Sequence, residues 1–325
     1  MVSIDTFKAK IKSSELTEDD YIRIEEKLSK KRIITNEENH KTMRGFVENI
    51  NITLDYRGIW IEGSLPKYVH GTNQRSLSIA ESAGALQQLG ADLGIDLLEA
   101  RVERVDVADN IITSYPVEEY YPILMHCKQF KRNEMDNGLG FRSRNRYMSF
   151  YGKMQEVKKS KEVPEEMLIG KNVLRYELRY LNNKSISSLI GIKNINLKSL
   201  LKNYKKLVEA WFSTFNSIMK MQKTMDFDQS IFQQKGLLDQ YLKVKGIEAF
   251  GGMGQIIKTV NSAKANGYLQ GHSNKRSYII NRLQNFYSNY KVGVCSDLGK
   301  ELEQKVLKSK IETMANLVVE QTNLW

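Results

Sequence analysis

Cysteine and histidine are scarce in this 325-residue chain, and their spacing excludes several kinds of site. Cys127 and Cys295 are too few and too far apart to build a disulfide framework or a zinc site. The histidines are scattered, with no pair separated by a single apolar residue: His40, His70, His126 and His272. A metal site built on such a pair is therefore not expected. With so little cysteine, the default compartment is reducing, as in a bacterial cytoplasm.

Long apolar runs are also missing. No segment approaches the roughly 20 apolar residues that a membrane-spanning helix needs. The first residues, Met1–Asp5, lack the basic-then-apolar layout of a secretion signal. The hydrophobic content of 41% is ample for a core, and the length allows two domains. No membrane partner is expected.

Positive charge is distributed unevenly along the chain. Residues 1–182 hold 28 basic and 28 acidic side chains, so residues 183–325 hold 49 − 28 = 21 basic and 38 − 28 = 10 acidic ones. The whole excess of +11 therefore lies in the second part. Such an excess favours a polyanion, usually nucleic acid, through release of counterions.

The first part of the chain alternates strand and helix patterns. Residues 2–10 alternate apolar and polar side chains, which predicts a half-buried strand. Thr17 followed by acidic residues predicts the start of a helix that runs to Leu28. Further strands are predicted at 43–49, 51–56, 58–63, around Asp106, at 146–153 and at 172–181, and further helices at 75–94 and 117–130.

After residue 183 the pattern becomes almost entirely helical. The predicted helices are 197–224, 229–243, 245–265, 273–289 and 297–323. Gly251–Gly254 resembles a phosphate-binding loop, but no strand precedes it and no lysine follows, so it predicts a helix junction. We therefore expect an α+β fold: an antiparallel-sheet catalytic domain in residues 1–182, followed by a mainly helical, basic domain in residues 183–325.

Two isolated acidic residues lie in predicted strands. Strand alternation places Arg104, Asp106 and Ala108 on one face of theirs. It likewise places Glu177 between Arg175 and Arg179. If the two strands are neighbours, Asp106 and Glu177 converge and repel each other unless a cation lies between them, and oxygen ligands favour Mg²⁺ or Mn²⁺. Each acidic residue alone is as readily a solvated surface residue, whereas the flanking arginines suit a phosphate.

A third predicted strand carries Tyr147, Ser149, Tyr151 and Lys153 on one face. A phenol with a pKa of about 10 needs help to attack phosphorus at neutral pH. Lys153 is placed to stabilise the phenolate or the phosphate, and a metal ion to polarise the phosphate oxygens. Glu156, just beyond, is a third candidate ligand or a base. Taken alone, Tyr151 is more often a packing residue, so the hypothesis rests on the combination.

Four blocks in this order give the chain a resemblance to a known family. They are Ile59–Asn73 with its Pro-Lys and Gly-Thr-Asn segment, Val105-Asp106, Tyr151-Gly-Lys-Met-Gln-Glu156, and Leu174-Arg-Tyr-Glu-Leu-Arg179. The ordered set resembles the gene II replication initiators of filamentous bacteriophages and the related Rep_trans initiators of rolling-circle plasmids. The resemblance spans roughly residues 1–182. One departure is Glu103, which makes the Asp106 strand more acidic than the family pattern.

The resemblance implies a site-specific nick in one DNA strand at a replication origin. Tyr151 then becomes linked to the 5′ phosphate, and a reverse reaction rejoins the strand at termination. Asp106 and Glu177 are implied metal ligands, with Glu156 as a further candidate and Lys153 as an auxiliary cation. Tyr147, on the same face, is an alternative nucleophile.

Other implied roles concern binding. Lys67 and Asn73 are expected in a turn that touches DNA or shapes the site, and Arg175 and Arg179 are expected on phosphates. The expected partners are single-stranded and duplex origin DNA and a host helicase, with a homodimer as one arrangement. Two alternatives stay open: a relaxase that mobilises a transfer origin, and a DNA-binding protein without catalysis.

Overall fold

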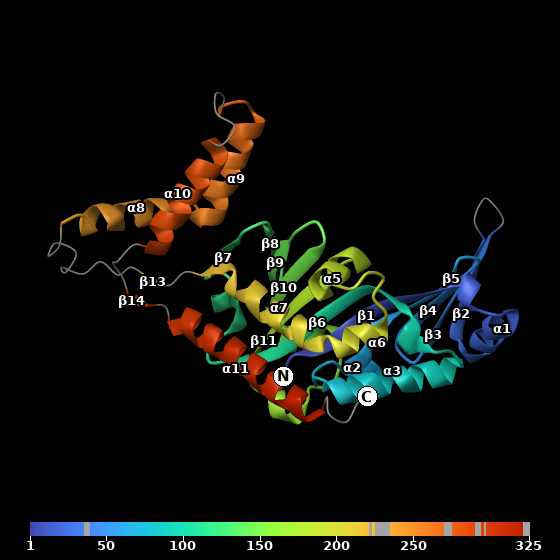
Figure 1. The fold of residues 1–325 in the computed structure, drawn as a ribbon. Helices are drawn as coiled ribbons and strands as arrows, with labels where there is room; N and C mark the ends of the chain where they lie inside the picture. Colours follow the sequence, from blue (N-terminus) through green and yellow to red (C-terminus); the bar gives the residue numbers. More distant parts are fainter. Residues whose placement is uncertain are drawn as a thin grey trace.

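The computed structural model describes residues 1–35, 40–220, 223–224, 235–269, 275–289, 294–295 and 297–320. Ten strands of this part form one antiparallel sheet (Figure 1). In spatial order they are β2 (Ser29–Thr35), β3 (Lys41–Val47), β4 (Ile50–Asp55), β5 (Gly58–Ser64), β1 (Ser3–Lys12), β6 (Arg101–Thr113), β11 (Asn172–Tyr180), β10 (Arg146–Gly152), β9 (Gly138–Arg142) and β8 (Lys131–Met135). The predicted α+β class with an antiparallel sheet is confirmed.

Helices connect the strands and then dominate the second part of the chain. In the first part they are α1 (Glu18–Lys27), α2 (Leu65–His70), α3 (Ile79–Leu93) and α4 (Lys153–Ser160). In the second they are α5 (Asn183–Ile190), α6 (Leu197–Lys202), α7 (Tyr204–Asn216), α8 (Leu237–Ala249), α9 (Gly252–Ala265), α10 (Lys275–Asn289) and α11 (Asp297–Glu320). Two short pairs, β7 (Leu124–Cys127) with β12 (Ile218–Lys220) and β13 (Lys223–Thr224) with β14 (Val294–Cys295), lie outside the main sheet. None of the described helices is long and apolar enough to cross a membrane.

Local signals in the sequence fix several element boundaries. Thr17 caps α1, as predicted, by accepting a hydrogen bond from the backbone of Asp20. Ser78 caps α3 in the same way, so that helix begins later than predicted from residue 75. Gly251 and Gly252 both adopt positive φ angles between α8 and α9, which confirms the predicted helix junction.

Two predicted helices are partly wrong. Residues 117–130 form one short 3₁₀ turn (Val117–Tyr120) and the strand β7, not a helix. The segment 197–224 breaks at Asn203 into α6 and α7, which are followed by β12, paired with β7, and by β13. In both segments the apolar residues have the spacing of a helical stripe. Part of each segment nevertheless forms a strand, because β7 and β12, which are distant in the sequence, make backbone hydrogen bonds with each other. Residues 229–234 of another predicted helix lie outside the described residues.

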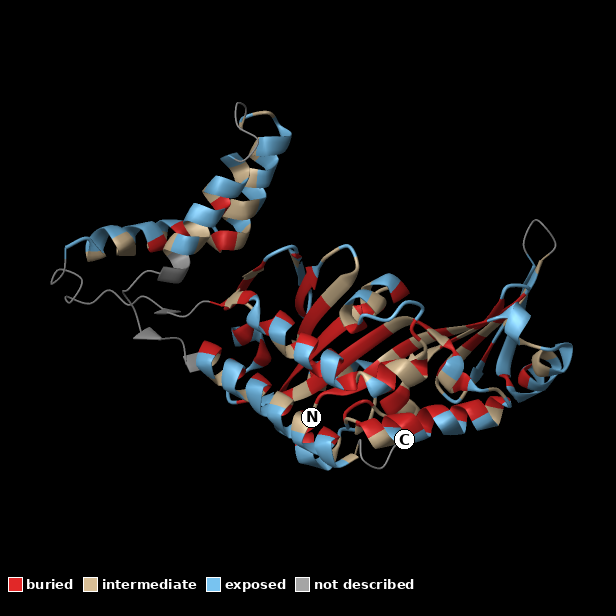
Figure 2. Ribbon diagram, viewed as in Figure 1, coloured by how far each residue is buried: buried red, intermediate tan, exposed pale blue. Residues whose placement is uncertain are grey.

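The larger hydrophobic core of the described residues lies on one face of the sheet. It contains alternate strand residues such as Val105 and Phe150 together with Leu86 of α3, Trp211 of α7 and Leu302 of α11. Figures 1 and 2 are drawn from this side, where α3, α6, α7 and α11 lie across the strands and turn their buried residues toward them. The opposite face of the sheet carries the alternating polar side chains.

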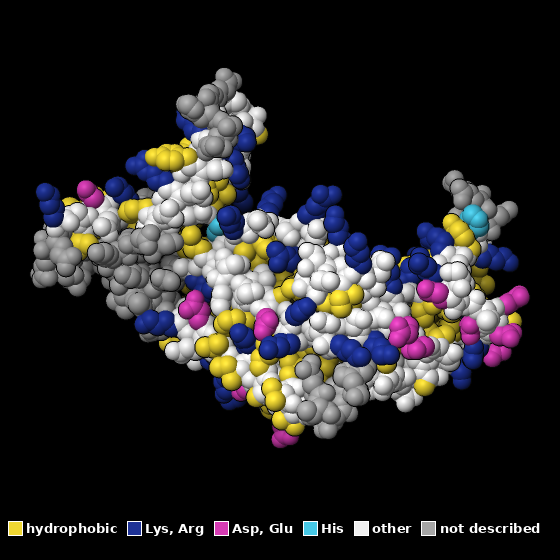
Figure 3. Space-filling model, in the orientation of Figure 1, with side chains coloured by type: hydrophobic (Ala, Val, Ile, Leu, Met, Phe, Trp, Pro, Cys, Tyr) yellow, Lys and Arg dark blue, Asp and Glu magenta, His cyan; other side chains and the backbone are white. Residues whose placement is uncertain are grey.

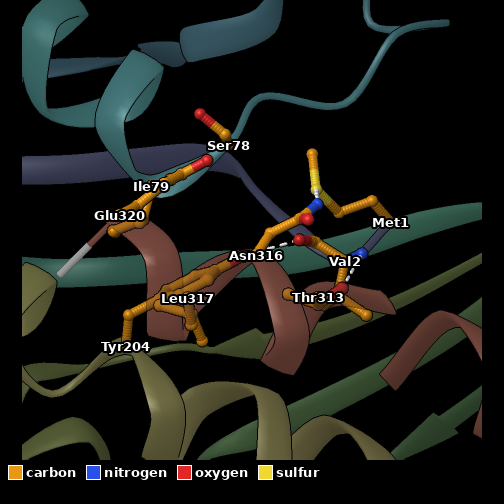
Figure 4. A pocket seen from close by; sticks show the side chains of 9 residues that line it. All are labelled: Met1, Val2, Ser78, Ile79, Tyr204, Thr313, Asn316, Leu317 and Glu320. Atoms are coloured by element: carbon orange, nitrogen blue, oxygen red, sulfur yellow. Dashed lines mark hydrogen bonds between the residues drawn. The ribbon is translucent and has the colours of Figure 1, made fainter. Parts of the chain in front are cut away.

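Helix α11 holds the beginning of the chain in place (Figure 4). The backbone N–H of Val2 donates to Thr313 at 2.9 Å, and the Tyr204 hydroxyl donates to the Val2 carbonyl at 2.7 Å. The Met1 amino group pairs with Asp109 at 3.1 Å. The cavity there measures about 10 Å³, room for one water at most. The boundary predicted at residue 182/183 stays a prediction, although α5–α7 and α11 share the core of the sheet.

Helices α8, α9 and α10 form an arm with a small core of its own. Val244 and Ile247 of α8 and Met253 of α9 pack there with Met125 of β7. In Figure 1 the arm projects from the end of the molecule near β7, and Figure 3 shows lysine and arginine side chains along it. Residues 235–289 contain eight basic and two acidic side chains, so the arm carries much of the positive excess.

Candidate active site

Three neighbouring strands bring the predicted site residues together. In the register of β6, β11 and β10, Arg179 lies opposite both Asp106 and Tyr147. One step along, Glu177 lies opposite Ala108 and Ser149; one further, Arg175 lies opposite Asn110 and Tyr151. Directly paired residues point to the same face, so these side chains share the face that is turned away from the core.

Glu177 is the centre of the resulting polar cluster. Its side chain is 3% exposed and accepts hydrogen bonds from Arg175 at 2.8 Å and Arg179 at 2.6 Å. Tyr151 and Ser149 donate further bonds at 2.7 and 3.3 Å. Burial by itself raises the pKa of Glu177, but the guanidinium groups of Arg175 and Arg179 outweigh it and hold that pKa below its usual range. Glu177 is therefore a firmly ionised carboxylate.

Asp106 is held by a different arginine. Arg104, two residues earlier on β6, makes a two-pronged pair with it at 2.9 and 2.6 Å. Asp106 is 2% exposed, and this burial raises its pKa to about 6 despite the opposing effect of Arg104 and Arg179. The two carboxylates thus lie on one face but differ in how readily they take a proton.

A positive group lies between the two carboxylates. Arg179 contacts Glu177 at 2.6 Å and Asp106 at 3.5 Å. The sequence predicts that a cation must separate these acids, and in this structure the cation is a guanidinium. Mg²⁺ is commonly bound by one or two carboxylates together with waters and substrate phosphates, so Asp106 and Glu177 are a suitable donor pair once Arg179 moves. Among the described residues, no three His, Cys, Asp or Glu side chains form a ready-made cluster.

Tyr151 lies inside this cluster. Its hydroxyl donates to Glu177 at 2.7 Å. Burial raises its pKa well above the ordinary value; Arg175 acts in the opposite direction, and Glu177 adds to the rise. In this state the phenol keeps its proton.

Tyr147 lies on the same face, one pairing position from the cluster centre. Its ring is 5.5 Å from the guanidinium of Arg179, and its hydroxyl contacts the sulfur of Met135 at 3.2 Å. It also lies close over Gly140 of the neighbouring strand. The hydroxyl contact of Tyr147 is exposed, whereas that of Tyr151 is partly buried, so the Tyr147 phenol is the more accessible of the two.

Lys153 differs from the prediction, because β10 ends at Gly152 and Lys153 begins α4. Its ammonium still reaches the cluster, because Asn73 accepts a hydrogen bond from it and offers its own carbonyl to Arg175. Lys153 is fully buried and contacts Asn73 at 2.6 Å and Glu156 at 2.5 Å. Burial and the neighbouring Arg175 lower the pKa of Lys153. Glu156, predicted as a third ligand, is paired with this lysine on α4.

The predicted turn residues reach the site to different extents. Asn73 is buried, accepts from Lys153, donates to Asp5 at 3.4 Å and offers its carbonyl to Arg175 at 3.2 Å. Lys67 instead pairs with Glu162 at 2.6 Å. Asn73 thus ties the Ile59–Asn73 block to the cluster.

Sequence reasoning missed one member of the cluster, Asp5. This carboxylate is 5% exposed and contacts Arg175 at 2.8 Å. An acidic residue in an alternating strand gives only a weak signal, and the β1–β6 pairing that places it comes from residues about 100 positions apart.

Comparison with known families covers this part of the chain. Residues 37–194 match the family model for the N-terminal region of the replication-associated gene II protein, and this stretch contains Asp106, Tyr151 and Glu177. This region of the chain is therefore similar to the N-terminal domain of the filamentous-phage gene II-type replication initiators, as its four sequence blocks indicate. A search of curated proteins finds no match.

Proposed function

We propose that this protein nicks one strand of origin DNA through Tyr151 and later rejoins that strand, in rolling-circle replication. The observation that carries the proposal is the 2.7 Å hydrogen bond from the Tyr151 hydroxyl to Glu177, inside a cluster of arginines and carboxylates. Covalent catalysis requires a nucleophile that is hydrogen-bonded to a base, and a base that is oriented by hydrogen bonds from other side chains. Tyr151 and Glu177 have this arrangement. The similarity to this family supports the role in replication initiation.

The chemistry balances with groups that lie in the cluster. The Tyr151 oxygen forms a bond to phosphorus and its proton passes to Glu177. The bond from phosphorus to the 3′ oxygen breaks, and the leaving oxygen takes up the proton that Glu177 returns through solvent. The products are a 5′-phosphotyrosine and a free 3′ hydroxyl, which primes synthesis. In the reverse reaction a 3′ hydroxyl attacks the phosphotyrosine and releases Tyr151, so joining needs no external energy source.

Arginine movement couples DNA binding to this proton transfer. In the described state a strongly ionised Glu177 faces a phenol with a raised pKa, so transfer is unfavourable. A scissile phosphate competes with Glu177 for Arg179, whose side chain is 31% exposed. Release of Arg179 frees the space between Glu177 and Asp106, so that a cation brought with the phosphate can take the place of the guanidinium. The site is therefore at rest until DNA arrives.

A divalent cation is part of the proposal. Asp106 and Glu177 would hold Mg²⁺ or Mn²⁺, which would neutralise charge on the phosphate oxygens. Glu156 stays a candidate for a further ligand only if it leaves Lys153. The basic arm of α8–α10 is proposed to bind the duplex beside the nick.

The test is adduct formation on a supercoiled library of replicon origins with Mn²⁺. Wild type is compared with Tyr151→Phe, Tyr147→Phe and Glu177→Gln. A covalent protein–DNA adduct is expected in wild type and Tyr147→Phe and not in Tyr151→Phe. Glu177→Gln is expected to slow adduct formation about 10²–10⁴-fold, the usual effect of losing a general base.

Other outcomes point elsewhere. Loss of the adduct only in Tyr147→Phe keeps the enzyme and moves the nucleophile to the more accessible tyrosine. Tight, salt-sensitive binding without any adduct favours a DNA-binding protein without catalysis. An adduct on transfer origins but not on replication origins favours a relaxase.

A further inference from the structure

A second feature of the polar sheet face lies away from the tyrosines, on strands β2–β5, β1 and β6. Alternate residues Ile59 and Ile61 point into the core, so Trp60 and Glu62 point to the opposite, polar face. The registers connect these residues into two rows across the sheet. The first row is Arg32, Arg44, Thr53, Trp60, Lys10 and Arg101, and the second is Phe46, Asn51, Glu62, Lys8 and Arg104.

Trp60 is the aromatic centre of the first row. Its ring is half-buried, with the Lys10 ammonium 4.3 Å and the Arg57 guanidinium 5.2 Å from its centre. Tyr56, which is 59% exposed, lies beside Arg57, whose guanidinium is 5.5 Å from its ring. An aromatic ring flanked by cations is the arrangement on which proteins stack bases of single-stranded nucleic acid while contacting the backbone.

The rows also bring like charges together. Arg32 lies directly opposite Arg44, and Lys10 opposite Arg101. Lys8 lies opposite Arg104, with Glu62 contacting both at 2.9 and 3.3 Å. Like charges directly across strands destabilise a sheet. The two rows hold six basic residues and one acidic residue, and Arg101 and Arg104 also pair with Glu103 and Asp106 outside the rows. The basic excess that stays on Lys10, Arg44 and Arg32 suits a bound polyanion.

The rows lead to the active site. The first row spans six strands, or five steps of about 4.8 Å, roughly 24 Å in all. The second row ends at Arg104, which holds Asp106 of the active site. Ser64, four residues along β5 from Trp60, shares the next row with Thr6 and Asp106. A strand lying on this face is thus continuous with the scissile position.

We propose that this sheet face binds the single strand of DNA adjoining the nick, with one base stacked on Trp60 and phosphates on Lys10, Arg44 and Arg32. The inference rests on the proposed nicking function but concerns a binding surface separate from the tyrosines. The contacts follow the backbone and one ring, so binding is tolerant of sequence. Sequence selection belongs to other parts of the molecule.

Binding is measured by fluorescence anisotropy of a labelled 12-nucleotide oligo-dT at several salt concentrations. The parent is full-length Tyr147→Phe/Tyr151→Phe, which has no tyrosine nucleophile. Trp60→Leu is expected to weaken binding on the order of ten-fold, and Trp60→Phe to retain most of it. Lys10→Gln is expected to reduce the slope of log affinity against log salt concentration by about one. The control is Lys27→Gln on α1, an exposed lysine on the other face of the sheet, which is expected to leave this slope unchanged.

Unchanged affinity in Trp60→Leu overturns the proposal, as does equal weakening for duplex and single-stranded probes. A circular-dichroism melt checks folding, and if Trp60→Leu does not fold, Lys10→Gln alone decides by its salt slope. Failure of the nicking function is distinguishable, because it removes the adduct from protein with intact tyrosines and leaves Trp60-dependent binding in place. If wild type forms the adduct but Trp60→Leu binds the oligonucleotide as tightly as its parent, only this inference is rejected and the nicking function stands.

Discussion

At the scale of single residues, the site is a set of acids whose charges are balanced by arginines. Arg175, Arg179 and Arg104 each contact two carboxylates. Arg175, Asp5, Asp106 and Glu177 are buried, whereas Arg179 and Arg104 are partly exposed. Removing one partner of a buried pair leaves an uncompensated charge, which is more costly than the pair itself contributes. The two acids nevertheless differ in pKa, because Glu177 has two close arginines and two hydroxyl donors, whereas Asp106 depends mainly on Arg104.

The raised pKa of Asp106 predicts a pH effect on stability. The folded pKa of about 6 lies above the unfolded value of about 3.9, so the folded state binds the proton more tightly. Ionised Asp106 therefore destabilises the fold, and this penalty grows as pH rises from about 4 to 6. We expect the stability of Asp106→Asn relative to wild type to improve over that range, by about 1.4 kcal/mol for each unit of pKa shift. Urea unfolding at pH 4, 5, 6 and 7 measures it, and a constant difference would contradict the prediction.

At the scale of elements, the antiparallel pairing of β6, β11, β10 and β9 determines what each tyrosine touches. Tyr151 pairs with Gly138, whereas Tyr147 pairs with Arg142 and its ring lies close over Gly140. A methyl group at Gly140 would come within 2.4 Å of the Tyr147 hydroxyl, the movable end of a side chain. At Gly138 it would come within 2.6 Å of the Phe150 carbonyl, which is backbone.

These two glycines give a matched pair of variants. Gly140→Ala is expected to fold, displace the Tyr147 ring and still form the Tyr151 adduct, since a side-chain tip moves at low cost. Gly138→Ala is expected to lower stability by about 1–3 kcal/mol, because the strand itself must shift. Thermal unfolding and the adduct assay measure both. If Gly140→Ala abolishes the adduct while remaining folded, the role of Tyr147 is larger than proposed.

At the scale of the whole molecule, charge and chemistry are separated. The acids and tyrosines lie on the sheet face, whereas the arm of α8–α10 has eight basic and two acidic residues and contacts the body through Met125. Figure 3, drawn from the helix-covered side, shows Lys and Arg side chains along the arm and Asp and Glu side chains mainly on the body. Proteins that neutralise several phosphates show a steep fall in affinity with salt, so the arm should contribute to that slope.

Lysines of the arm test this contribution. Lys258 and Lys264 are exposed on α9. Lys258→Gln/Lys264→Gln is expected to reduce the slope of log affinity against log salt for duplex DNA by about two, one per lost phosphate contact. Lys27→Gln on α1 is the control and should leave the slope unchanged. If the slope of the Lys258→Gln/Lys264→Gln variant equals that of Lys27→Gln, the arm does not bind the duplex.

The sequence by itself determined the class of fold, most strands of the sheet and the residues that share a face with Asp106 and with Glu177 on their own strands. These follow from local rules, because side chains alternate strictly along a strand and capping residues mark helix ends. Only the tertiary structure decided that the strands of Asp106 and Glu177 are neighbours, that Asp5 joins the cluster, that Arg179 lies between the two acids and that Lys153 begins α4. Those facts depend on strand order and register between distant segments, on which alternation within a single strand carries no information.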